Sequence, residues 1–157
     1  MKFIISTIYS VILLILSNNV GTGQDKNWSQ WRGLNYDGIA NSEQNPPISF
    51  NKKNNIIWSS KIEGRGHGSP TVHGNKVFLA TADESLKTQS LICINRKTGE
   101  RVWTRKVHEG GFPEKSNKKA SHASSTPATD GKLVYVNFLN DGAVYTTAYD
   151  FEGKKIW

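Results

Sequence analysis

A pattern that occurs twice limits the fold of this chain more than any other feature. It consists of a strand, a tight turn and a second strand that leads to tryptophan, and it spans residues 93–103 and 148–157. Asn or Asp suits the turn entry because its short side chain bonds to backbone amides further along, and glycine suits a positive φ. The matching positions are Asn95 and Asp150 at the entry, Gly99 and Gly153 in the turn, and Trp103 and Trp157 at the end. Two copies of one hairpin indicate a repeat protein.

The repeat extends upstream of the hairpin. Residues 68–79 match residues 125–136, with Pro70 and Pro127 lying 57 positions apart. Each unit then contains a proline-started strand, a glycine turn, a strand rich in β-branched and aromatic residues, a loop, and the closing hairpin. Four short strands at a spacing of roughly 45 to 57 residues are typical of propeller blades.

A weaker third copy of the closing strand is present at Trp58, 45 positions before Trp103, and we expect a short strand over residues 56–62. A four-stranded unit cannot bury both faces alone, so neighbouring units must stack around an axis. We expect Trp58, Trp103 and Trp157 to cover the seams between consecutive units. The predicted fold is therefore all-β, a partial propeller of about two to three blades with four antiparallel strands each.

The first residues have the pattern of a secretory signal. Lys2 precedes an apolar run over residues 3–16, and small and polar residues follow up to Gly23. Such a run is too short to span a bilayer comfortably. We assign residues 1–23 to a signal peptide and residues 24–157 to the repeat domain, with a periplasmic or secreted location and no stable membrane span after cleavage. An uncleaved N-terminal anchor is the alternative.

The charge balance is basic, with 20 Lys and Arg against 13 Asp and Glu and a net charge of +7. The basic residues lie singly along the expected strands and turns, apart from a looser group at Lys115, Lys118 and Lys119. No basic run alternates with stacking aromatics, as an RNA-binding surface requires. The sequence favours a solvated basic surface and no nucleic-acid partner.

Cys93 is the only cysteine, so the chain forms no internal disulfide. In the repeat it aligns with Ala148, at a position that suits a small buried residue. This alignment predicts a small apolar role for Cys93 rather than that of a nucleophile or a metal ligand.

Two tryptophans near the expected domain start have two interpretations. Trp28 and Trp31 lie three positions apart beside Arg32, which could form a ligand box. We favour an N-terminal strap that both tryptophans pin onto a sheet. Residues 41–55 contain two adjacent prolines, and we expect them to cross the surface in an extended form.

These residues resemble the repeat of pyrroloquinoline-quinone (PQQ) dehydrogenase-like β-propellers, in which a small residue and Asp precede Thr-Gly-Lys and Trp. Residues 95–103 fit with Asn for Asp and Glu for Lys, whereas residues 148–157 lack the Thr and are one residue shorter. Residues 28–33, followed by Asp37 and Gly38, are similar to the N-terminal motif of exported bacterial PQQ-like repeat proteins.

The resemblance implies a fold and leaves two classes of function. Quinoprotein alcohol and glucose dehydrogenases hold PQQ and calcium near the propeller axis and oxidise alcohols or sugars. Other members, such as the outer-membrane assembly lipoprotein with this fold, bind protein partners and no cofactor. The sequence has no adjacent cysteine pair and no identifiable counterpart of a dehydrogenase's cofactor and calcium residues. Fold alone does not decide between the two classes.

Histidines and carboxylates give only weak signals of a site. His67 and His122 precede the two proline-started strands, near the expected axis, but two histidines are fewer than a zinc centre needs. The other residues considered are His73 and His108, and the loop carboxylates Asp83, Glu84, Glu109 and Glu114. These carboxylates lack the density of a calcium loop. We assign no catalytic, cofactor-binding or metal-binding residue.

Residues 109–120 form the longest irregular stretch between units, and we favour a solvated connection over a partner-binding loop. A closed propeller takes about four to eight blades, so we expect this chain to be part of a larger ring. The leading hypothesis is an exported binding or assembly scaffold, with a protein partner or small ligand at the propeller face and no catalysis in this stretch. The alternatives are the N-terminal part of a PQQ- and calcium-dependent dehydrogenase, and carbohydrate binding through exposed aromatics.

Overall fold

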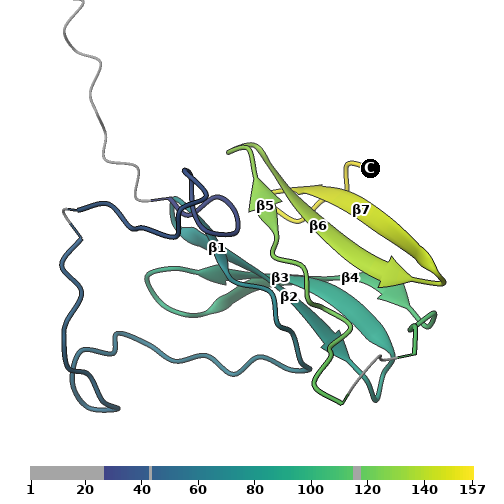
Figure 1. The fold of residues 1–157 in the computed structure, drawn as a ribbon, viewed down its shortest axis with the longest axis horizontal. Coiled ribbons are helices and arrows are strands. Elements are labelled where there is room, and N and C mark those ends of the chain that lie inside the picture. Colours follow the sequence, from purple (N-terminus) through teal and green to yellow (C-terminus); the bar gives the residue numbers. More distant parts are fainter. Residues whose placement is uncertain (1–26, 43, 115–117) are drawn as a thin grey trace, which may run out of the picture.

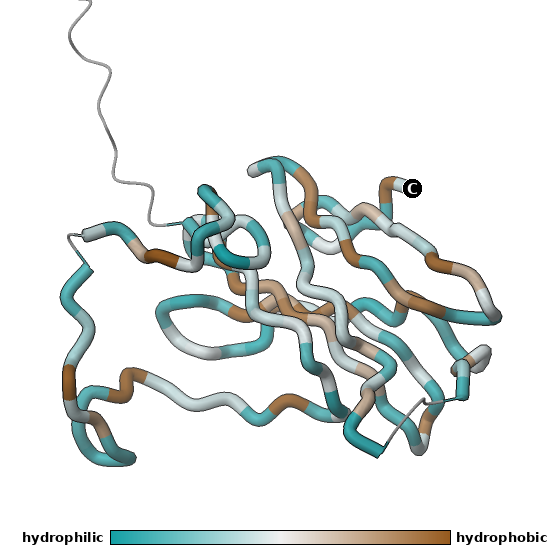
Figure 2. The backbone as a smooth tube through the Cα atoms, viewed as in Figure 1, coloured by the Kyte–Doolittle hydropathy of each residue, from teal (hydrophilic) through white to brown (hydrophobic). Residues whose placement is uncertain are grey.

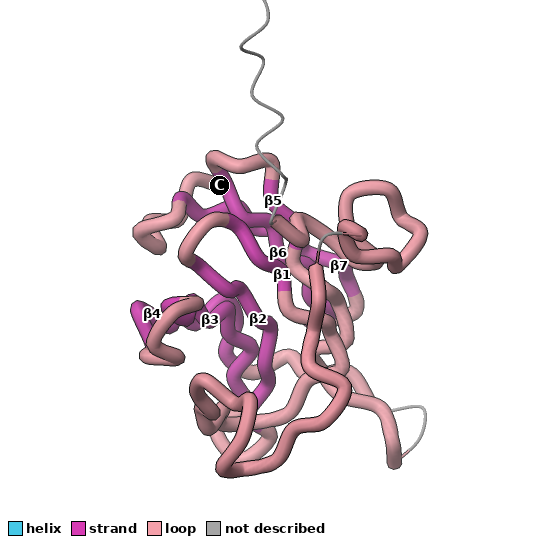
Figure 3. The backbone as a smooth tube through the Cα atoms, turned by 90° about the vertical axis from the view of Figure 1, so that its left-hand side faces the viewer, coloured by secondary structure: helices cyan, strands magenta, loops and turns pink. Residues whose placement is uncertain are grey.

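The computed structural model describes residues 27–42, 44–114 and 118–157. Seven β-strands and no helix are present in these residues (Figures 1 and 3). Accordingly, no helix in the described part of the chain is long and apolar enough to cross a membrane. The predicted signal peptide, residues 1–23, and Lys115 lie outside the described residues.

The strands form two antiparallel sheets that lie next to each other (Figure 1). The first sheet has four strands in chain order, β1 (Thr71–His73), β2 (Lys76–Asp83), β3 (Thr88–Asn95) and β4 (Arg101–Glu109). The second sheet has three, β5 (Ala128–Thr129), β6 (Leu133–Asn140) and β7 (Ala143–Asp150). Beyond β7 a single bridge joins Tyr149 to Lys155, at the place that β4 occupies in the first sheet. The all-β prediction is confirmed, and the sheets are consistent with blades of a partial propeller.

The two units begin in the same way. β1 starts directly after Pro70 and β5 directly after Pro127, as the repeat predicts. In the second unit, the Asp130 carboxylate accepts hydrogen bonds from the backbone N–H groups of Lys132 and Leu133, at 2.8 Å each. This side chain closes the turn between β5 and β6, which is the role that a short polar residue has in a tight turn.

The core lies between the two sheets. Alternate residues of a strand point to opposite faces, so each sheet contributes every second side chain. From the first sheet come Phe78, Ala80 and Ala82 of β2 and Leu91 and Cys93 of β3; from the second come Val134, Val136 and Phe138 of β6 and Tyr149 of β7. Figure 2 shows hydrophobic residues recurring along the central strands. Cys93 is fully buried and its counterpart Ala148 is also fully buried, which confirms the predicted small apolar role.

The N-terminal segment bridges both units. Trp28 and Val72 of β1 exchange two backbone hydrogen bonds of 2.8 Å, and the Ser29 carbonyl accepts one of 2.9 Å from Thr129 of β5. The strap interpretation is therefore confirmed for Trp28. It is wrong for Trp31, which is 60% exposed and has the Arg32 guanidinium over its ring.

Residues 56–62 form no strand, contrary to the prediction. The segment runs across the outer face of the first sheet and is held by side chains instead. The Trp58 indole donates to the Arg96 carbonyl at 2.8 Å, and the Thr81 hydroxyl donates to the Glu63 carbonyl at 2.7 Å. A strand needs a neighbouring strand to bond its backbone, and no described strand lies alongside these residues.

Both predicted hairpin turns are present. The Asn95 side chain accepts hydrogen bonds from the backbone N–H groups of Lys97 and Thr98, and Gly99 has a φ of 74°. One detail differs, because the strand that contains Trp103 continues to Glu109 and the tryptophan lies near its start. The part beyond Trp103 pairs with residues 88–92 of β3, so β4 follows nearly the whole length of that strand.

Candidate functional site

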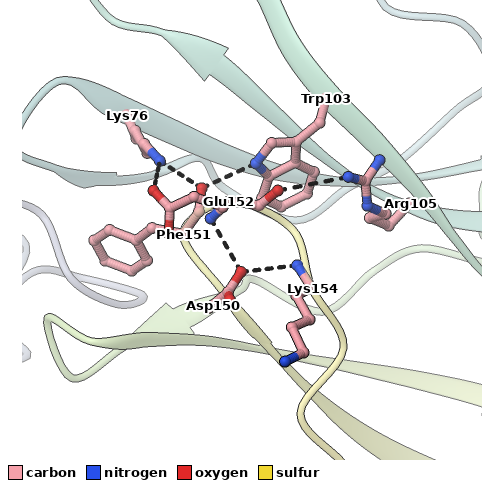
Figure 4. A network of polar contacts seen from close by, with 7 residues as sticks. All are labelled: Lys76, Trp103, Arg105, Asp150, Phe151, Glu152 and Lys154. Atoms are coloured by element: carbon pink, nitrogen blue, oxygen red, sulfur yellow. Dashed lines mark hydrogen bonds and ion pairs between the residues drawn. The ribbon is translucent and has the colours of Figure 1, made fainter.

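The richest cluster of polar contacts lies at the junction of the two sheets, around the turn that follows β7 (Figure 4). Trp103 from β4 is only 7% exposed, and its indole N–H donates to the Phe151 carbonyl at 3.0 Å. A Cβ placed on Gly153 would lie 2.9 Å from the Trp103 ring. Because real Cβ atoms do not approach that closely, only glycine lets the turn sit flat against the indole.

Two cations complete this junction. The Lys76 ammonium from β2 bonds to the Phe151 carbonyl and forms an ion pair of 2.9 Å with Glu152. On the other side of the indole, the Arg105 guanidinium donates to the Gly153 carbonyl at 2.6 Å. The Arg105 guanidinium also lies 5.6 Å from the centre of the Trp103 ring, within range of a cation–π contact. The first unit therefore satisfies two carbonyls of the second unit's turn.

Asp150 shapes the turn from within. Its carboxylate accepts hydrogen bonds from the backbone N–H groups of Glu152 and Lys154, at 3.1 and 2.7 Å (Figure 4). This is the role that the sequence predicts for it and for Asn95 in the first copy. The turn carbonyls of residues 151 and 153 are left pointing toward the first unit, where Trp103 and Arg105 bind them.

An equivalent contact precedes the first sheet. The Trp58 indole is half-buried, and a Cβ on Gly99 would lie 2.6 Å from its ring. Its N–H donates to Arg96, the counterpart of Phe151, at 2.8 Å. Trp58 and Trp103 thus meet the following turn in the same way. Trp157 is 56% exposed and its ring centre lies 6.0 Å from that of Tyr135. Its predicted contact with a following unit stays a prediction, because residues 27–157 contain no such turn after it.

A second polar cluster seals the far end of the junction. The Gln89 side chain of β3 is fully buried and donates to the carbonyls of His122 and Leu139, at 2.8 and 3.0 Å. Its oxygen accepts from the Asn140 amide at 3.1 Å, and that amide also donates to the Gly110 carbonyl at 2.8 Å. Buried amides of this kind are stable only when they are fully hydrogen-bonded, so this cluster locks the two sheets in one register.

The pKa shifts at the junction have structural causes. Burial raises the pKa of the Cys93 thiol to about 11, so the group stays neutral and is no nucleophile at neutral pH. Burial likewise raises the pKa of Tyr149. The backbone N–H groups of Leu133 and Lys132, followed by the Tyr135 hydroxyl, lower the pKa of Asp130 to about 2. A hydrogen bond from Arg101 lowers the pKa of Glu63.

The histidines considered from sequence do not gather at one point. The backbone N–H of His67 bonds to the Ala123 carbonyl at 2.9 Å, so the segments of His67 and His122 run side by side. The His122 ring packs against Phe112, with ring centres 4.2 Å apart. His73 packs against Phe151. In the described part of the chain, no three residues among His, Cys, Asp and Glu come together as a metal ion would require.

His108 is distinguished by a feature that sequence does not show. Its ring packs against Phe138 and Tyr145 of the second sheet, with ring centres 6.1 and 5.1 Å away. The Nε2 atom is buried and has no hydrogen-bond partner among the described residues. Burial, followed by the charge of Lys155, lowers the pKa of His108, which favours the neutral ring.

The loop carboxylates serve local structure. Asp83 accepts backbone hydrogen bonds from Ser85 and Leu86 and closes the turn between β2 and β3. Glu109 forms an ion pair with Lys106 on the same strand. Glu84 and Glu114 are exposed.

The described ends of the predicted loop 109–120 are bonded to both units. Gly110 donates a backbone hydrogen bond to the Lys87 carbonyl and Asp141 donates one to the Gly111 carbonyl, at 2.8 Å each. On the far side, the Arg65 guanidinium bonds to the carbonyls of Lys118 and Lys119. The two ends are therefore part of the junction.

Sequence reasoning missed one concave feature altogether. An open hollow of about 210 Å³ lies against the described residues of the N-terminal loop, 27–42 and 44. Its walls are mainly the side chains of short polar residues, which have no periodic pattern in the sequence. Only the backbone conformation of the loop brings them to one place.

Stacked antiparallel sheets, joined by a tryptophan that meets the glycine turn of the following unit, define the chain as a series of β-propeller blades. The family model described as outer membrane protein assembly factor BamB matches residues 43–157, well over half of the chain. The chain therefore belongs to this family of PQQ-like β-propeller repeat proteins. No curated protein matches the chain.

Proposed function

We propose that this chain is an exported β-propeller scaffold that binds other exported polypeptides and performs no catalysis in the stretch from residue 27 to residue 157. The proposal rests on the hydrogen bonds that the polar side chains form at the junction of the two sheets. Lys76, Trp103 and Arg105 all bond to the turn of residues 151–153. These groups, which in an enzyme could act on a substrate, hold one unit against the next.

The family supports a polypeptide partner. Its description, outer membrane protein assembly factor, agrees with a role in binding other polypeptides.

Export is the second part of the proposal and rests on the apolar run of residues 3–16. Alkaline phosphatase fused after residue 157 should be active in a bacterial host, because this reporter folds only after export. Deletion of residues 2–23 should abolish the phosphatase activity at equal protein level. Equal activity of the two fusions would contradict export through this segment.

Binding is tested with an unfolded outer-membrane β-barrel protein as the probe. We expect the 157-residue chain to bind the diluted, unfolded barrel saturably and to speed its folding into lipid vesicles. No saturable binding of the unfolded barrel by the unchanged chain would contradict the scaffold proposal.

A direct measurement distinguishes the scaffold from the competing class of protein, a quinoprotein dehydrogenase. The protein is incubated with PQQ and calcium and examined for a bound-quinone absorption spectrum and for dye-linked oxidation of ethanol and glucose. We expect neither. Stoichiometric quinone binding together with turnover would replace the scaffold proposal by the dehydrogenase.

A further inference from the structure

The N-terminal loop has a shape that its own backbone fixes. Arg32 and Tyr36 adopt positive φ angles of 63° and 60°, which are uncommon outside glycine, and Gly33 and Gly38 adopt φ angles of 74° and 77°. The backbone N–H of Gly38 donates to the Arg32 carbonyl at 2.9 Å. Strained residues of this kind persist only where the surrounding structure determines them, and they concentrate at binding sites.

The loop is anchored to the sheets on one side. Trp28 bonds to Val72 of β1, and the Asn27 side chain accepts a hydrogen bond of 2.8 Å from the backbone N–H of Gly74. Figure 1 shows this segment, in dark blue, beside β1 and β5. The Trp28 ring is held in place by Gly33, where a Cβ would lie 2.9 Å from it. The hollow therefore has a rigid floor.

The side chains around the hollow have one chemical character. The polar ones are four amides and one carboxylate, from Asn27, Asn35, Asn41, Gln44 and Asp37. Trp28 and the aliphatic residues Leu34, Ile39 and Ala40 supply apolar surface, and no Lys, Arg or His among the described residues lines the hollow. Each amide offers both donors and an acceptor, and a carboxylate offers acceptors only. This set suits a neutral ligand with many hydroxyl groups, and the carboxylate disfavours an anion.

Several of these polar groups are available to a ligand. Within the described part of the chain, the side-chain amides of Asn35 and Gln44 make no hydrogen bond. Asp37 uses one carboxylate oxygen, Oδ1, to accept a hydrogen bond of 2.8 Å from the backbone of Ile39. That bond orients the carboxylate and leaves its second oxygen without a hydrogen bond among the described residues.

We propose that this hollow binds one neutral sugar residue, with the amides of Asn35 and Gln44 and the Asp37 carboxylate on its hydroxyl groups and Trp28 against its apolar face. The volume of about 210 Å³ is smaller than the roughly 300–1,000 Å³ of a drug-sized ligand pocket, which limits the occupant to a single ring. This site goes beyond the scaffold role and does not depend on it. Free monosaccharides and the terminal residues of glycans share the required chemistry.

The experiment uses the 157-residue chain and measures tryptophan fluorescence and saturation-transfer NMR. The probes are the methyl glycosides of glucose, galactose, mannose and N-acetylglucosamine, with maltotriose and chitotriose as oligosaccharide arms and glucuronate as the anionic counterpart. We expect saturable binding of at least one neutral probe with a Kd on the order of 1 mM. Glucuronate should bind more weakly than glucose. Tighter binding of a trisaccharide than of its monosaccharide identifies a glycan end as the source.

Two variants test the assignment to this hollow. Asn35→Ala and Gln44→Ala each remove one hydrogen-bonding side chain and should weaken binding by about 3- to 10-fold. Asn137→Ala, which removes an exposed amide on β6, is the matched control and should leave the affinity unchanged. All three should keep the urea midpoint of the unchanged chain. The proposal is overturned by no saturable response to any neutral probe, by tighter binding of glucuronate, or by equal affinities of the three variants.

Discussion

The inner face of the first sheet and the outer face of the second sheet carry equivalent positions of the repeat, but they differ in what covers them. The inner face of the first sheet is covered by the second sheet, and Phe78 and Cys93, which are paired across β2 and β3, are both fully buried. The outer face of the second sheet presents the corresponding pair, Tyr135 and Ala148, of which Tyr135 is partly exposed and Ala148 is buried. No described sheet covers that outer face, and Val144 there is 70% exposed.

The comparison shows how one pattern of alternation supports both a closed and an open face. Ala80 and Leu91 are fully buried in the first sheet, and their counterparts in the second are Asn137 and Thr146, which are exposed. Small and apolar side chains allow the sheets to approach closely, whereas polar ones keep a face compatible with water. The two sheets therefore share strand direction and register and differ in the side chains that they place on these equivalent faces.

The largest expected difference between the faces concerns the two tryptophans. Trp103→Ala empties the junction and removes the indole donor from the Phe151 carbonyl, so the free energy of unfolding should fall by about 3–5 kcal/mol. Trp157→Ala should lower it by about 1 kcal/mol or less, because that ring is mostly exposed. Urea denaturation followed by circular dichroism measures both. Similar losses for the two variants would show that the outer face is covered in solution.

A residue exchange between the faces should have the next largest effect. Ala80→Asn places the amide found at position 137 into the closed junction, where it is buried without a partner, and should cost about 2–4 kcal/mol. Asn137→Ala places the small residue on the open face and should change stability by less than about 0.5 kcal/mol. The urea midpoints of both variants provide the measurement, and a mild effect of Ala80→Asn would mean that the junction is loosely packed.

Alanine substitutions at two glycines with positive φ distinguish the cost of backbone strain from the cost of a clash with the Trp103 indole. Gly153→Ala meets both, since its φ is 83° and the added Cβ would lie 2.9 Å from Trp103, and should cost about 2–3 kcal/mol. Gly142→Ala meets only the first, with a φ of 75° and open space around it, and should cost about 1 kcal/mol. Thermal unfolding of both variants in the same buffer measures the difference in stability. Equal losses of stability would show that the contact with the indole contributes nothing to the cost of Gly153→Ala.

The smallest effect is a pH dependence at the junction. Burial, and to a smaller extent the charge of Lys155, lowers the pKa of folded His108 below its ordinary value of 6.5, whereas Asp141 opposes this shift. The unfolded chain therefore binds more protons just below pH 6.5, and the unfolding free energy should rise as the pH increases through that range. His108→Gln should flatten this slope, and His73→Gln should leave it in place. A slope that survives His108→Gln would assign the effect to another group.

Sequence was sufficient for the features that depend on backbone chemistry. Asn95 and Asp150 at the turn entries and the glycines that follow them have local roles, so their residue types alone predict the two hairpins. The contact of Trp103 with the next unit also followed from the period of the repeat. Trp31 and the segment of residues 56–62 were predicted incorrectly, because tryptophan and isoleucine favour burial and strand structure only where a neighbouring element is present.

The N-terminal hollow could not have been found from sequence. Asn35, Asp37 and Gln44 are ordinary loop residues, and what brings them together is the left-handed backbone at Arg32 and Tyr36. Non-glycine residues at positive φ leave no signature in composition or periodicity. The unpartnered Nε2 of His108 is similar, since its environment is set by two residues of another sheet.

The strap of residues 27–29 has a consequence for the order in which the molecule matures. Its Trp28 bonds need only β1, whereas the Ser29 carbonyl needs Thr129 of β5. Because the chain is synthesised from its N-terminus, this early segment must wait for a strand made much later before its last bond can form. The beginning of the domain is thus fully secured only after β5 has been made.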